Sequence, residues 1–558
     1  MQFFTWVLNL VLICSLLGNF FSESAYSPKP PICSEQDRAS LLTFKASILK
    51  DTTDTLSSWI SRDCCDGGWE GVQCDASTGR VNMLQIQSPD VRDSGSFMKG
   101  TLSPALGNLQ FLEVMMISGM KHITGPIPSS FTNLTNLKHL VLEDNSLGGC
   151  IPPSLGSLSL LETLSLSGNQ LKGQIPPTIG NLKNLVQVNV ARNFLSGSIP
   201  LGFKSLRNLN YLDLSYNLLS GPIPDFVGEF RNLTNLDLSY NLLTGKIPVS
   251  LFSLVNLVDL SMSYNKLTGN IPDQIGNLKS LTSLQLSGNQ LTGHFPLSIS
   301  KLQKLWYLNV SRNGFSDPLP AIPIKGIPSL LSIDLSYNNL SLGSVPDWIR
   351  SKQLIHVRLA GCKLKSDLPS FVRPDSLSSI DLSDNFLVDG ISNFFTNMSS
   401  LQDVKLSNNQ LRFDISKIKL PSGLSSIDLH SNLLIGSLST FINNMTSSSL
   451  EVIDVSNNFI SGNIPEFAEG SSLKILNLGS NNLSGQLQNL QWLDVSINGI
   501  TGQIPSSFSQ ITNLKHASFR TNRLCGEIPQ TRPFNIFPPA TYAHNLCLCG
   551  KPLQPCKA

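Results

Sequence analysis

The stretch Leu209-Asn-Tyr-Leu-Asp-Leu-Ser-Tyr-Asn217 contains the pattern that decides the fold. Its leucines at positions 209, 212 and 214 are placed to point inward from a short strand, while the side chains at 210, 211, 213, 215 and 216 point outward. One strand of this kind cannot bury its apolar side alone, so it needs neighbours of the same kind. The stretch therefore predicts one unit of a stacked, repetitive protein.

The same pattern recurs along most of the chain as Leu-x-x-Leu-x-Leu-x-x-Asn-x-Leu-x-Gly-x-Ile-Pro. Its asparagine column begins with equal intervals at Asn145, Asn169, Asn193, Asn217, Asn241, Asn265 and Asn289. The column continues at Asn313, Asn338, Cys362, Asn385, Asn409, Asn432, Asn458, Asn481, Asn498 and Asn522, and two irregular repeats lie upstream. Such regular spacing identifies the pattern as the leucine-rich repeat. We therefore predict an α/β solenoid, a right-handed leucine-rich-repeat superhelix with a parallel concave sheet and about nineteen repeats over residues 81–524.

The recurring asparagine is expected to be buried where the strand turns away, because its amide can satisfy backbone groups of its own turn and of the adjacent one. Cys362 is an accepted substitute in that column. The segment Gly221-Pro-Ile-Pro224 predicts an irregular return path, where a proline without an N–H group costs nothing. The interval from Asn481 to Asn498 is shorter than any other in the column. There the chain either cuts straight back to the next strand or has lost a short piece.

Eight of the eleven cysteines lie in two clusters at the ends of the repeat array, namely Cys33, Cys64, Cys65 and Cys74, and Cys525, Cys547, Cys549 and Cys556. An even number at each end is typical of disulfides in an oxidising compartment, and metal ligation is the alternative. No histidine accompanies the N-terminal cluster, which favours disulfides. Cys150 and Cys362 are about nine repeats apart, which is too far for a disulfide between them. We therefore expect both to be free thiols, and to be buried.

A solenoid exposes an apolar face at each end and therefore needs a cap there. We expect an N-terminal cap over residues 25–80 and a C-terminal cap over residues 525–558. In the first, Ser34 and Asp37 are spaced to cap a short helix. Trp59 and Trp69 are expected to cover the first repeat.

The chain begins with an apolar run followed by small residues at the −3 and −1 positions of a cut after Ser24, which predicts a signal peptide over residues 1–24. The run is shorter than the roughly 20 apolar residues of a membrane span, which is the alternative. We find no second apolar stretch of that length and expect secretion. The chain has 40 basic against 38 acidic residues, so its charge gives no case for nucleic acid or an anionic membrane surface.

The cap sequence Leu56-Ser-Ser-Trp59, Cys64-Cys65 and Trp69-x-Gly-Val-x-Cys74 resembles the N-terminal cap of plant extracellular leucine-rich-repeat proteins. The tail from Leu524-Cys-Gly-Glu-Ile-Pro through Tyr542-Ala-His-Asn545 to Cys556 is similar to that of polygalacturonase-inhibiting proteins. Receptor-like proteins and receptor-kinase ectodomains have comparable repeat arrays. The resemblance implies the disulfides Cys33–Cys64, Cys65–Cys74, Cys525–Cys547 and Cys549–Cys556.

No catalytic constellation stands out in the sequence, and the seven histidines are scattered over different repeats. The sequence contains no Walker loop, no His-Glu-x-x-His motif and no zinc-spaced set of cysteine and histidine. We therefore predict a non-enzymatic protein that needs neither a cofactor nor a metal ion.

The outward positions of the concave sheet are the expected partner surface, because stacked strands arrange them in columns on a rigid frame. One candidate set follows the common repeat, so a framework role is the alternative for Asp213, Tyr216, Asp237, Tyr240, Asp259 and Tyr264. A second set breaks the common pattern with residue types enriched at binding hot spots, namely Trp306, Tyr307, Arg312, His356 and Arg358. Tolerated drift is the alternative for this set.

Glycosylation sequons occur at Asn133, Asn232, Asn309, Asn339, Asn397, Asn444 and Asn482. A glycan on Asn309 would project from the concave sheet and restrict a partner's footprint. The sequence favours recognition of a protein or peptide ligand in the plant extracellular space or cell wall, in defence or signalling, with a receptor-kinase ectodomain as a candidate partner. The resemblance adds inhibition of a pathogen polygalacturonase as an alternative, and a structural cell-wall role is a further one.

Overall fold

The computed structural model describes residues 32–88, 95–323, 325–443, 449–463, 472–484, 492–504 and 514–556. These residues fall into two compact units, Met1–Ser146 and Leu147–Ala558. The predicted signal peptide lies outside the described residues. Within the described ranges, no helix combines the length and apolar character required to cross a membrane.

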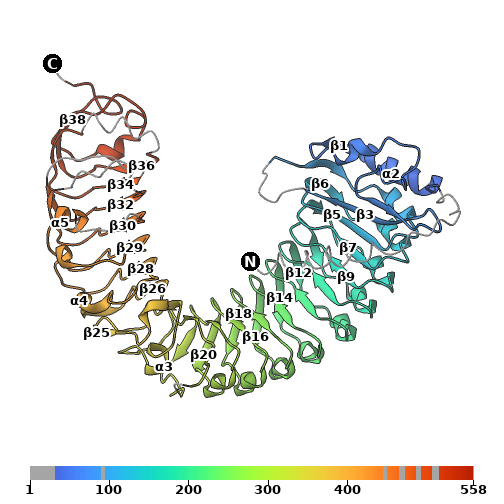
Figure 1. The fold of residues 1–558 in the computed structure, drawn as a ribbon, viewed down its shortest axis with the longest axis horizontal. Coiled ribbons are helices and arrows are strands. Elements are labelled where there is room, and N and C mark those ends of the chain that lie inside the picture. The colour runs from blue at the N-terminus through green and yellow to red at the C-terminus, as the bar shows by residue number, and fades with distance from the viewer. Residues whose placement is uncertain are drawn as a thin grey trace, which may run out of the picture. The chain divides into compact units, whose positions relative to one another are not determined.

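Over residues 32–88 and 95–146, the first unit contains one long helix and two small sheets (Figure 1). The helix is α2 (Glu35–Ser47). One sheet pairs β2 (Val72–Cys74) antiparallel with β3 (Val81–Gln87), and β3 is followed in parallel by β5 (Val114–Ser118) and β7 (His139–Val141). The other sheet contains β1 (Ile48–Asp51), β4 (Met98–Thr101) and β6 (Lys121–Pro126). Single-turn helices lie between the strands, at η1 (Thr55–Ser58), η2 (Pro104–Asn108) and η3 (Ser129–Asn133).

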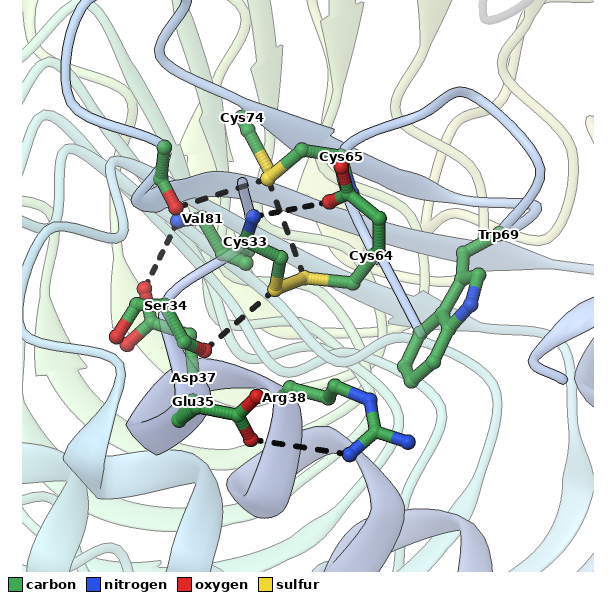
Figure 2. Close-up of a disulfide and its surroundings, with 12 residues drawn as sticks. Cys33, Ser34, Glu35, Asp37, Arg38, Cys64, Cys65, Trp69, Cys74 and Val81 are labelled. Atoms are coloured by element: carbon green, nitrogen blue, oxygen red, sulfur yellow. Dashed lines mark hydrogen bonds and ion pairs between the residues drawn. A yellow bond between two sulfur atoms is a disulfide. The ribbon is translucent and has the colours of Figure 1, made fainter. Parts of the chain in front are cut away.

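The predicted helix cap at Ser34 and Asp37 is wrong, although the helix begins where it was expected. Ser34 makes no side-chain bond at the helix start. Asp37 is fully buried, and its carboxylate accepts two hydrogen bonds from the Arg80 guanidinium, at 2.8 and 2.9 Å. It accepts a third from the backbone N–H of Val81 at 3.0 Å, and Figure 2 labels both Asp37 and Val81. A buried carboxylate needs charged or hydrogen-bonding partners, and Asp37 takes them from the start of β3 instead of its own helix. It therefore fastens the cap helix to β3.

The cysteine clusters form the four disulfides that the resemblance implied, Cys33–Cys64, Cys65–Cys74, Cys525–Cys547 and Cys549–Cys556. Figure 2 shows the N-terminal cluster. The tryptophans Trp59 and Trp69 are both buried, with stacked rings 5.2 Å apart. Their indole N–H groups donate to the Glu70 carbonyl and the Ser61 hydroxyl, so the buried rings leave no donor unpaired.

The second unit is a stack of short parallel strands, which confirms the predicted solenoid (Figure 1). Neighbouring strands are in register, so that Tyr211, Asn235 and Asp259 lie side by side, as do Leu212, Leu236 and Leu260. The strands of this concave sheet are β9 (Thr163–Ser165), β11 (Gln187–Asn189), β13 (Tyr211–Asp213), β15 (Asn235–Asp237), β17 (Asp259–Ser261), β19 (Ser283–Gln285), β21 (Tyr307–Asn309), β23 (Ser332–Asp334), β24 (His356–Arg358), β26 (Ser379–Asp381), β28 (Asp403–Lys405), β29 (Ser426–Asp428), β30 (Val452–Asp454), β32 (Ile475–Asn477), β34 (Trp492–Asp494) and β36 (His516–Ser518).

The expected irregular return path is in part a second parallel sheet, so that prediction is wrong. Its strands are β10 (Lys172–Gln174), β12 (Phe194–Gly197), β14 (Leu218–Pro222), β16 (Leu242–Lys246), β18 (Lys266–Gly269), β20 (Gln290–His294) and β22 (Gly314–Ser316). Pro222 is the last residue of β14, and a proline is tolerated at the end of a strand, where no ladder N–H is needed. Irregular backbone begins only after these strands.

Shorter elements complete the convex side and the C-terminal end. Each regular repeat continues into a single-turn helix, from η4 to η10 at Pro153–Ser157, Pro177–Asn181, Leu201–Ser205, Asp225–Glu229, Val249–Ser253, Asp273–Asn277 and Leu297–Lys301. The later repeats contain α3 (Asp347–Arg350), α4 (Ile391–Phe394), α5 (Leu438–Asn443), β25 (Lys365–Asp367), β27 (Phe386–Asp389), η11 (Pro374–Ser376) and η12 (Ile415–Lys417). Strands β31 (Ser461–Asn463), β33 (Asn482–Ser484), β35 (Thr501–Gly502), β37 (Arg523–Glu527) and β38 (Cys547–Cys549), with η14 (Pro539–Tyr542), close the array.

The asparagine column forms a buried hydrogen-bond ladder, as predicted. In Asn217, Oδ1 accepts from the Leu195 N–H of the preceding repeat at 2.9 Å. Its Nδ2 donates to the Val190 carbonyl of that repeat and to the carbonyls of Leu214 and Ser215 in its own repeat. One amide thus satisfies four backbone groups that would otherwise be buried without partners.

The ladder also crosses the irregular part of the array. The Leu483 N–H donates to Asn498 Oδ1 at 3.1 Å, although the two residues are only 15 apart instead of the usual 22. Strand β32 pairs directly with β34 there, so the described parts of the short repeat keep the register of the sheet. Asn545 extends the ladder into the C-terminal cap, where it accepts from the Leu524 N–H at 3.1 Å.

The two remaining cysteines differ, and the prediction for one of them is wrong. Cys362 is buried in the asparagine column, and its thiol donates to the carbonyls of Leu335 and Ala360. Burial raises the pKa of Cys362 to about 12, and the carboxylates of Asp334 and Asp317 add to the rise. Cys150 is exposed, because it precedes Ile151 in the outward column that Gln174 and Ser198 occupy in later repeats.

Replacing a ladder asparagine is expected to destabilise the solenoid strongly. Asn241→Ala removes the acceptor of the Leu219 N–H and the donor to three carbonyls. Because unpaired buried polar groups cost about 1–3 kcal/mol each, we expect the free energy of unfolding to fall by about 2–4 kcal/mol in urea titrations. Asn270→Ala, at an exposed asparagine of the next repeat, is the control and is expected to change it by less than about 0.5 kcal/mol. Equal effects of the two substitutions would contradict the ladder's role.

Candidate functional site

The aspartate column on the concave sheet is tied into the framework. In Asp213, Asp237, Asp334, Asp381, Asp428, Asp454 and Asp494, Oδ1 accepts the backbone N–H two residues on, at 2.8–3.1 Å. Asp213 is only 9% exposed, and the neighbouring Ser215 is also buried, although both were expected to project outward. These bonds favour the framework alternative for Asp213.

Three of the candidate carboxylates lie on adjacent strands and have raised pKa values. Asp213 and Asp237 are direct neighbours across β13 and β15, and Asp259 lies on β17. Burial raises the pKa of Asp237 to about 6, and the Asp213 carboxylate adds to the rise. Burial also raises the pKa of Asp213 and of Asp259, although the Asn235 amide donates to Asp259 at 2.9 Å.

The candidate tyrosines form a continuous stack beside these aspartates. The rings of Tyr216 and Tyr240 are 4.1 Å apart, and those of Tyr240 and Tyr264 are 4.4 Å apart. All three residues are exposed. Their φ angles of 51° to 54° place this position in the left-handed region in successive repeats, immediately before the ladder asparagine. The next repeat has Gly288 there, and the Tyr264 ring lies against it.

The second candidate set forms a separate patch on β21, β23 and β24. Trp306 is 43% exposed, and its ring lies 5.6 Å from that of Tyr307. Tyr307 and His356 occupy the same column, with Ser332 between them. Arg358 is exposed on β24, between Asp334 and Asp381 in its column. Strand β19 lies between this patch and the strands that carry the aspartates and tyrosines.

Leu331, which was not predicted, adds to this aromatic patch, and the predicted Arg312 packs on Tyr337. Leu331 is 37% exposed and lies in the outward column of Trp306, one repeat further on. Arg312 places its guanidinium over the ring of Tyr337 at 4.7 Å, and the Tyr337 hydroxyl donates to Asp384 at 2.6 Å. Aligning the outward columns would have found Leu331, but the Tyr337–Asp384 bond joins side chains two repeats apart and has no sequence signal.

A histidine and two aspartates also meet on the concave sheet outside the predicted site. His430 Nδ1 lies 2.7 Å from Asp428 Oδ1, and this bond raises the pKa of His430. Ligand atoms of Asp428, His430 and Asp454 lie within 4.8 Å of one another. The carboxylates already accept hydrogen bonds from Ser407, Ser456 and Asn477, so we assign no metal to them.

The sequons differ in how the structure presents them. Five of the asparagines are exposed, namely Asn133, Asn232, Asn339, Asn397 and Asn482. Asn309 is half-buried, and its side-chain oxygen accepts from the Ser311 N–H and hydroxyl. Asn444 lies outside the described residues. Glycan occupancy at these positions stays a prediction.

Models of known families match several parts of the chain. A leucine-rich repeat region matches residues 91–241, and a leucine-rich repeat N-terminal domain matches residues 34–75. Single leucine-rich repeats match at residues 232–254, 256–278, 280–302, 449–470 and 489–511.

Similar proteins include inhibitors and receptors of plants. A polygalacturonase inhibitor of Vitis vinifera is 35% identical over 107 residues, which is 19% of this chain and 29% of the inhibitor. The ectodomain of the Arabidopsis thaliana receptor kinase GASSHO1/SCHENGEN3, solved with CASPARIAN STRIP INTEGRITY FACTOR 2, is 31% identical with a TM-score of 0.74, over 92% of this chain and 64% of the ectodomain. The plant peptide hormone receptor RGFR1, solved with RGF2, is 30% identical with a TM-score of 0.61, over 81% of each chain. The chain spans about a third of the length of the first curated relatives, at 32%, 37% and 29%.

Fold and surface together define a disulfide-capped solenoid that presents a rigid sheet of outward side chains. With the matching repeats and the solved ectodomains beside it, the chain belongs to the plant extracellular leucine-rich-repeat proteins. The predicted resemblance to polygalacturonase inhibitors and receptor ectodomains is thereby confirmed.

The raised pKa of Asp237 predicts a pH-dependent stability. Because the folded pKa of about 6 lies above the ordinary 3.8, the folded state binds the proton more tightly, and this contribution is lost as the pH rises from about 4 to 6. Asp237→Asn should leave stability at pH 4 nearly unchanged and raise it at pH 7, by on the order of 1–3 kcal/mol relative to wild type. Urea unfolding at both pH values measures the difference.

The control for this experiment is Asp273→Asn, which replaces an exposed carboxylate at the start of η9. It should not change the pH dependence. An Asp237→Asn effect of the same size at pH 4 and pH 7 would show that the buried carboxylate is not the cause.

Proposed function

We propose that the chain is a secreted, non-enzymatic recognition protein of the plant extracellular space or cell wall, with residues 1–24 as its signal peptide. Its ligand is a protein or peptide segment that lies on the concave sheet across β21, β23 and β24. The observation that carries this proposal is the exposure of Trp306 beside Tyr307, at a strand that pairs with a neighbour on each side.

The surroundings of Trp306 define the chemistry of the ligand. Trp306 and Leu331 present exposed apolar surface in one column, and Arg358 presents a cation one repeat beyond Leu331. A fitting segment places an apolar or aromatic side chain against Trp306 and a carboxylate beside Arg358. Asp334 and Asp381 flank Arg358. A hydrogen-bond donor on the ligand, next to the ligand's own carboxylate, can therefore bond to one of these two aspartates.

The similar ectodomains support a peptide or protein ligand. The GASSHO1/SCHENGEN3 and RGFR1 structures each contain a bound partner, CASPARIAN STRIP INTEGRITY FACTOR 2 and RGF2 respectively. Defence or receptor signalling, with a receptor-kinase ectodomain as partner, follows from this likeness as part of the proposal.

Inhibition of a secreted polygalacturonase is the second candidate function. The grape inhibitor supports it, as does the cluster of Asp213, Asp237 and Asp259 on three adjacent strands. Such a cluster would attract a basic surface of the enzyme. Asp259 is the residue to test, because it is less buried than Asp213, and its bonds come from the side chains of Asn235 and Thr282 instead of a backbone N–H.

Binding titrations of the purified, disulfide-bonded chain test these proposals. One panel contains synthetic plant secreted peptides with receptor-kinase ectodomains, and the other contains fungal endopolygalacturonases, followed by pectate hydrolysis. We expect saturable binding to a member of the first panel, weakened at least about tenfold by Trp306→Ala and by Arg358→Glu, since hot-spot residues contribute about 2 kcal/mol or more.

The matched control is Leu297→Ala, an exposed apolar residue on the convex helix η10, which should leave binding unchanged. Binding that survives both Trp306→Ala and Arg358→Glu would overturn the assignment of the patch. Inhibition of a polygalacturonase that Asp259→Lys weakens, without peptide binding, would favour the second candidate.

A further inference from the structure

A ridge of exposed apolar side chains runs along one edge of the concave sheet, through four consecutive repeats. It contains Phe194, Tyr216, Leu218, Tyr240, Leu242 and Tyr264, which are 39–57% exposed. Arg192 and Lys266 lie at its two ends. Soluble monomers seldom expose this much contiguous apolar surface unless it is used for binding.

The ridge consists of two parallel rows. The first row holds Arg192, Tyr216, Tyr240 and Tyr264, and its three rings stack on one another. The second row holds Phe194, Leu218, Leu242 and Lys266, each two residues further on, at the start of β12, β14, β16 and β18. The ladder asparagine between each pair points inward and is buried, so both rows face solvent.

The second row is also apolar in three later repeats, at Phe386, Leu433 and Phe459, but the first row there has Asp384, Ser431 and Asn457, whereas the ridge is apolar in both rows. In the same column, after the ladder residues Asn338 and Asn481, the chain has Asn339 and Asn482. Both belong to sequons, Asn339-Leu-Ser and Asn482-Leu-Ser. Within the ridge the column has phenylalanine, leucine, leucine and lysine, and none of the predicted sequons falls in it.

We propose that the ridge is the self-association surface of this protein, and that its occupant is the same ridge of a second copy. The arrangement of charge is the reason. The two cations lie at diagonally opposite corners of the two-row grid, Arg192 in the first row and Lys266 in the second. The other six positions are apolar or aromatic.

This grid is complementary to itself under a two-fold axis, as a symmetric dimer requires. If the axis runs along the rows, Arg192 faces Phe194 of the second copy, and Tyr264 faces its Lys266. Between these ends, Tyr216 and Tyr240 face leucines of the second copy. With the axis across the rows, Arg192 faces a Tyr264 and Lys266 faces a Phe194. In both arrangements one cation lies against the Phe194 ring and the other lies beside the exposed edge of the Tyr264 ring, whose faces are covered by Tyr240 and Gly288, and no two cations of the grid meet.

The area of the ridge suits a weak dimer. The six apolar side chains expose about 500 Å² per copy, judging from roughly 200 Å² for a whole large side chain, so a pair buries on the order of 1,000 Å². That lies at the lower limit of specific interfaces, and we expect a micromolar dissociation constant. Tyr216, Tyr240 and Tyr264 thus gain a role other than the ligand contact predicted for them.

Sedimentation equilibrium of the full secreted chain tests the proposal, at loadings from about 1 to 100 µM, which bracket the expected dissociation constant. Wild type should fit a monomer–dimer equilibrium. Leu218→Asp should raise the dissociation constant at least tenfold, because it buries a charge in the apolar row. Val249→Asp is the matched control, since Val249 is 52% exposed against 46% for Leu218 and lies on the convex helix η8. It should leave the equilibrium unchanged.

A second variant keeps the test valid if Leu218→Asp fails to fold. Leu242→Asn creates an Asn-Leu-Thr sequon with Leu243 and Thr244, at the column where Asn482 has one naturally. A glycan there should leave the chain monomeric at every loading, with wild-type circular dichroism, and occupancy is checked by mass spectrometry. Wild type that sediments as a monomer throughout would overturn the proposal and leave the ridge to a different protein. A dimer that survives both variants would also overturn it.

Discussion

The buried side-chain amide of the repeating asparagine is the constraint on which the rest of this structure depends. Short parallel strands offer few hydrogen bonds of their own, and the chain must turn out of the sheet and return once in every repeat. From Asn193 onward, each described asparagine of the column resolves that problem by accepting a backbone N–H of the preceding repeat and donating to carbonyls of both repeats. It therefore holds the concave sheet and the second sheet at a fixed distance. Asn498 does the same across the shortened repeat, and Asn545 does it inside the C-terminal cap.

Because the backbone groups bond to one another and to the asparagines, the outward side chains can bind a partner. They differ in how many contacts they already make within the protein. Asp213 and Asp237 each accept the backbone N–H two residues on, and the burial of Asp213 and the partial burial of Asp237 make them part of the frame. The tyrosines lie in the left-handed backbone position and pack on one another, so their rings present edges to solvent. Trp306, Leu331 and Arg358 make no comparable framework bonds. Departures from the repeat are therefore more informative about recognition than its commonest residues.

The sequence was sufficient for the parts of the fold that a single column determines. The asparagine positions, the inward leucines and Cys362 could be predicted because one repeat dictates the environment of each. The role of Asp37 could not, because its partner Arg80 lies 43 residues away and no periodicity connects them. The second sheet was not predicted because of Pro222. A proline argues against a strand, and the sequence does not show that Pro222 is the last residue of one. The exposure of Cys150 could have been predicted, because Gln174 and Ser198 occupy the same column in later repeats. Burial was predicted instead because an unpaired cysteine is usually buried. At the candidate site, Trp306, Tyr307 and Arg358 could be proposed because they break the repeat, but Leu331 was missed. The stacking of the tyrosines and the burial of Asp213 depend on packing between repeats.

Hydrogen exchange at the ladder amides tests the central claim most directly. The N–H groups of Leu195, Leu219, Leu243 and Leu267 each donate to an asparagine of the next repeat. Exchange measured by mass spectrometry with fragmentation to single residues should find them as slow as the amides of strands β13, β15 and β17, because a ladder amide exchanges only when neighbouring repeats separate. Exchange of these four amides within seconds, while the concave strands remain protected, would show that the asparagine bonds do not hold the repeats together.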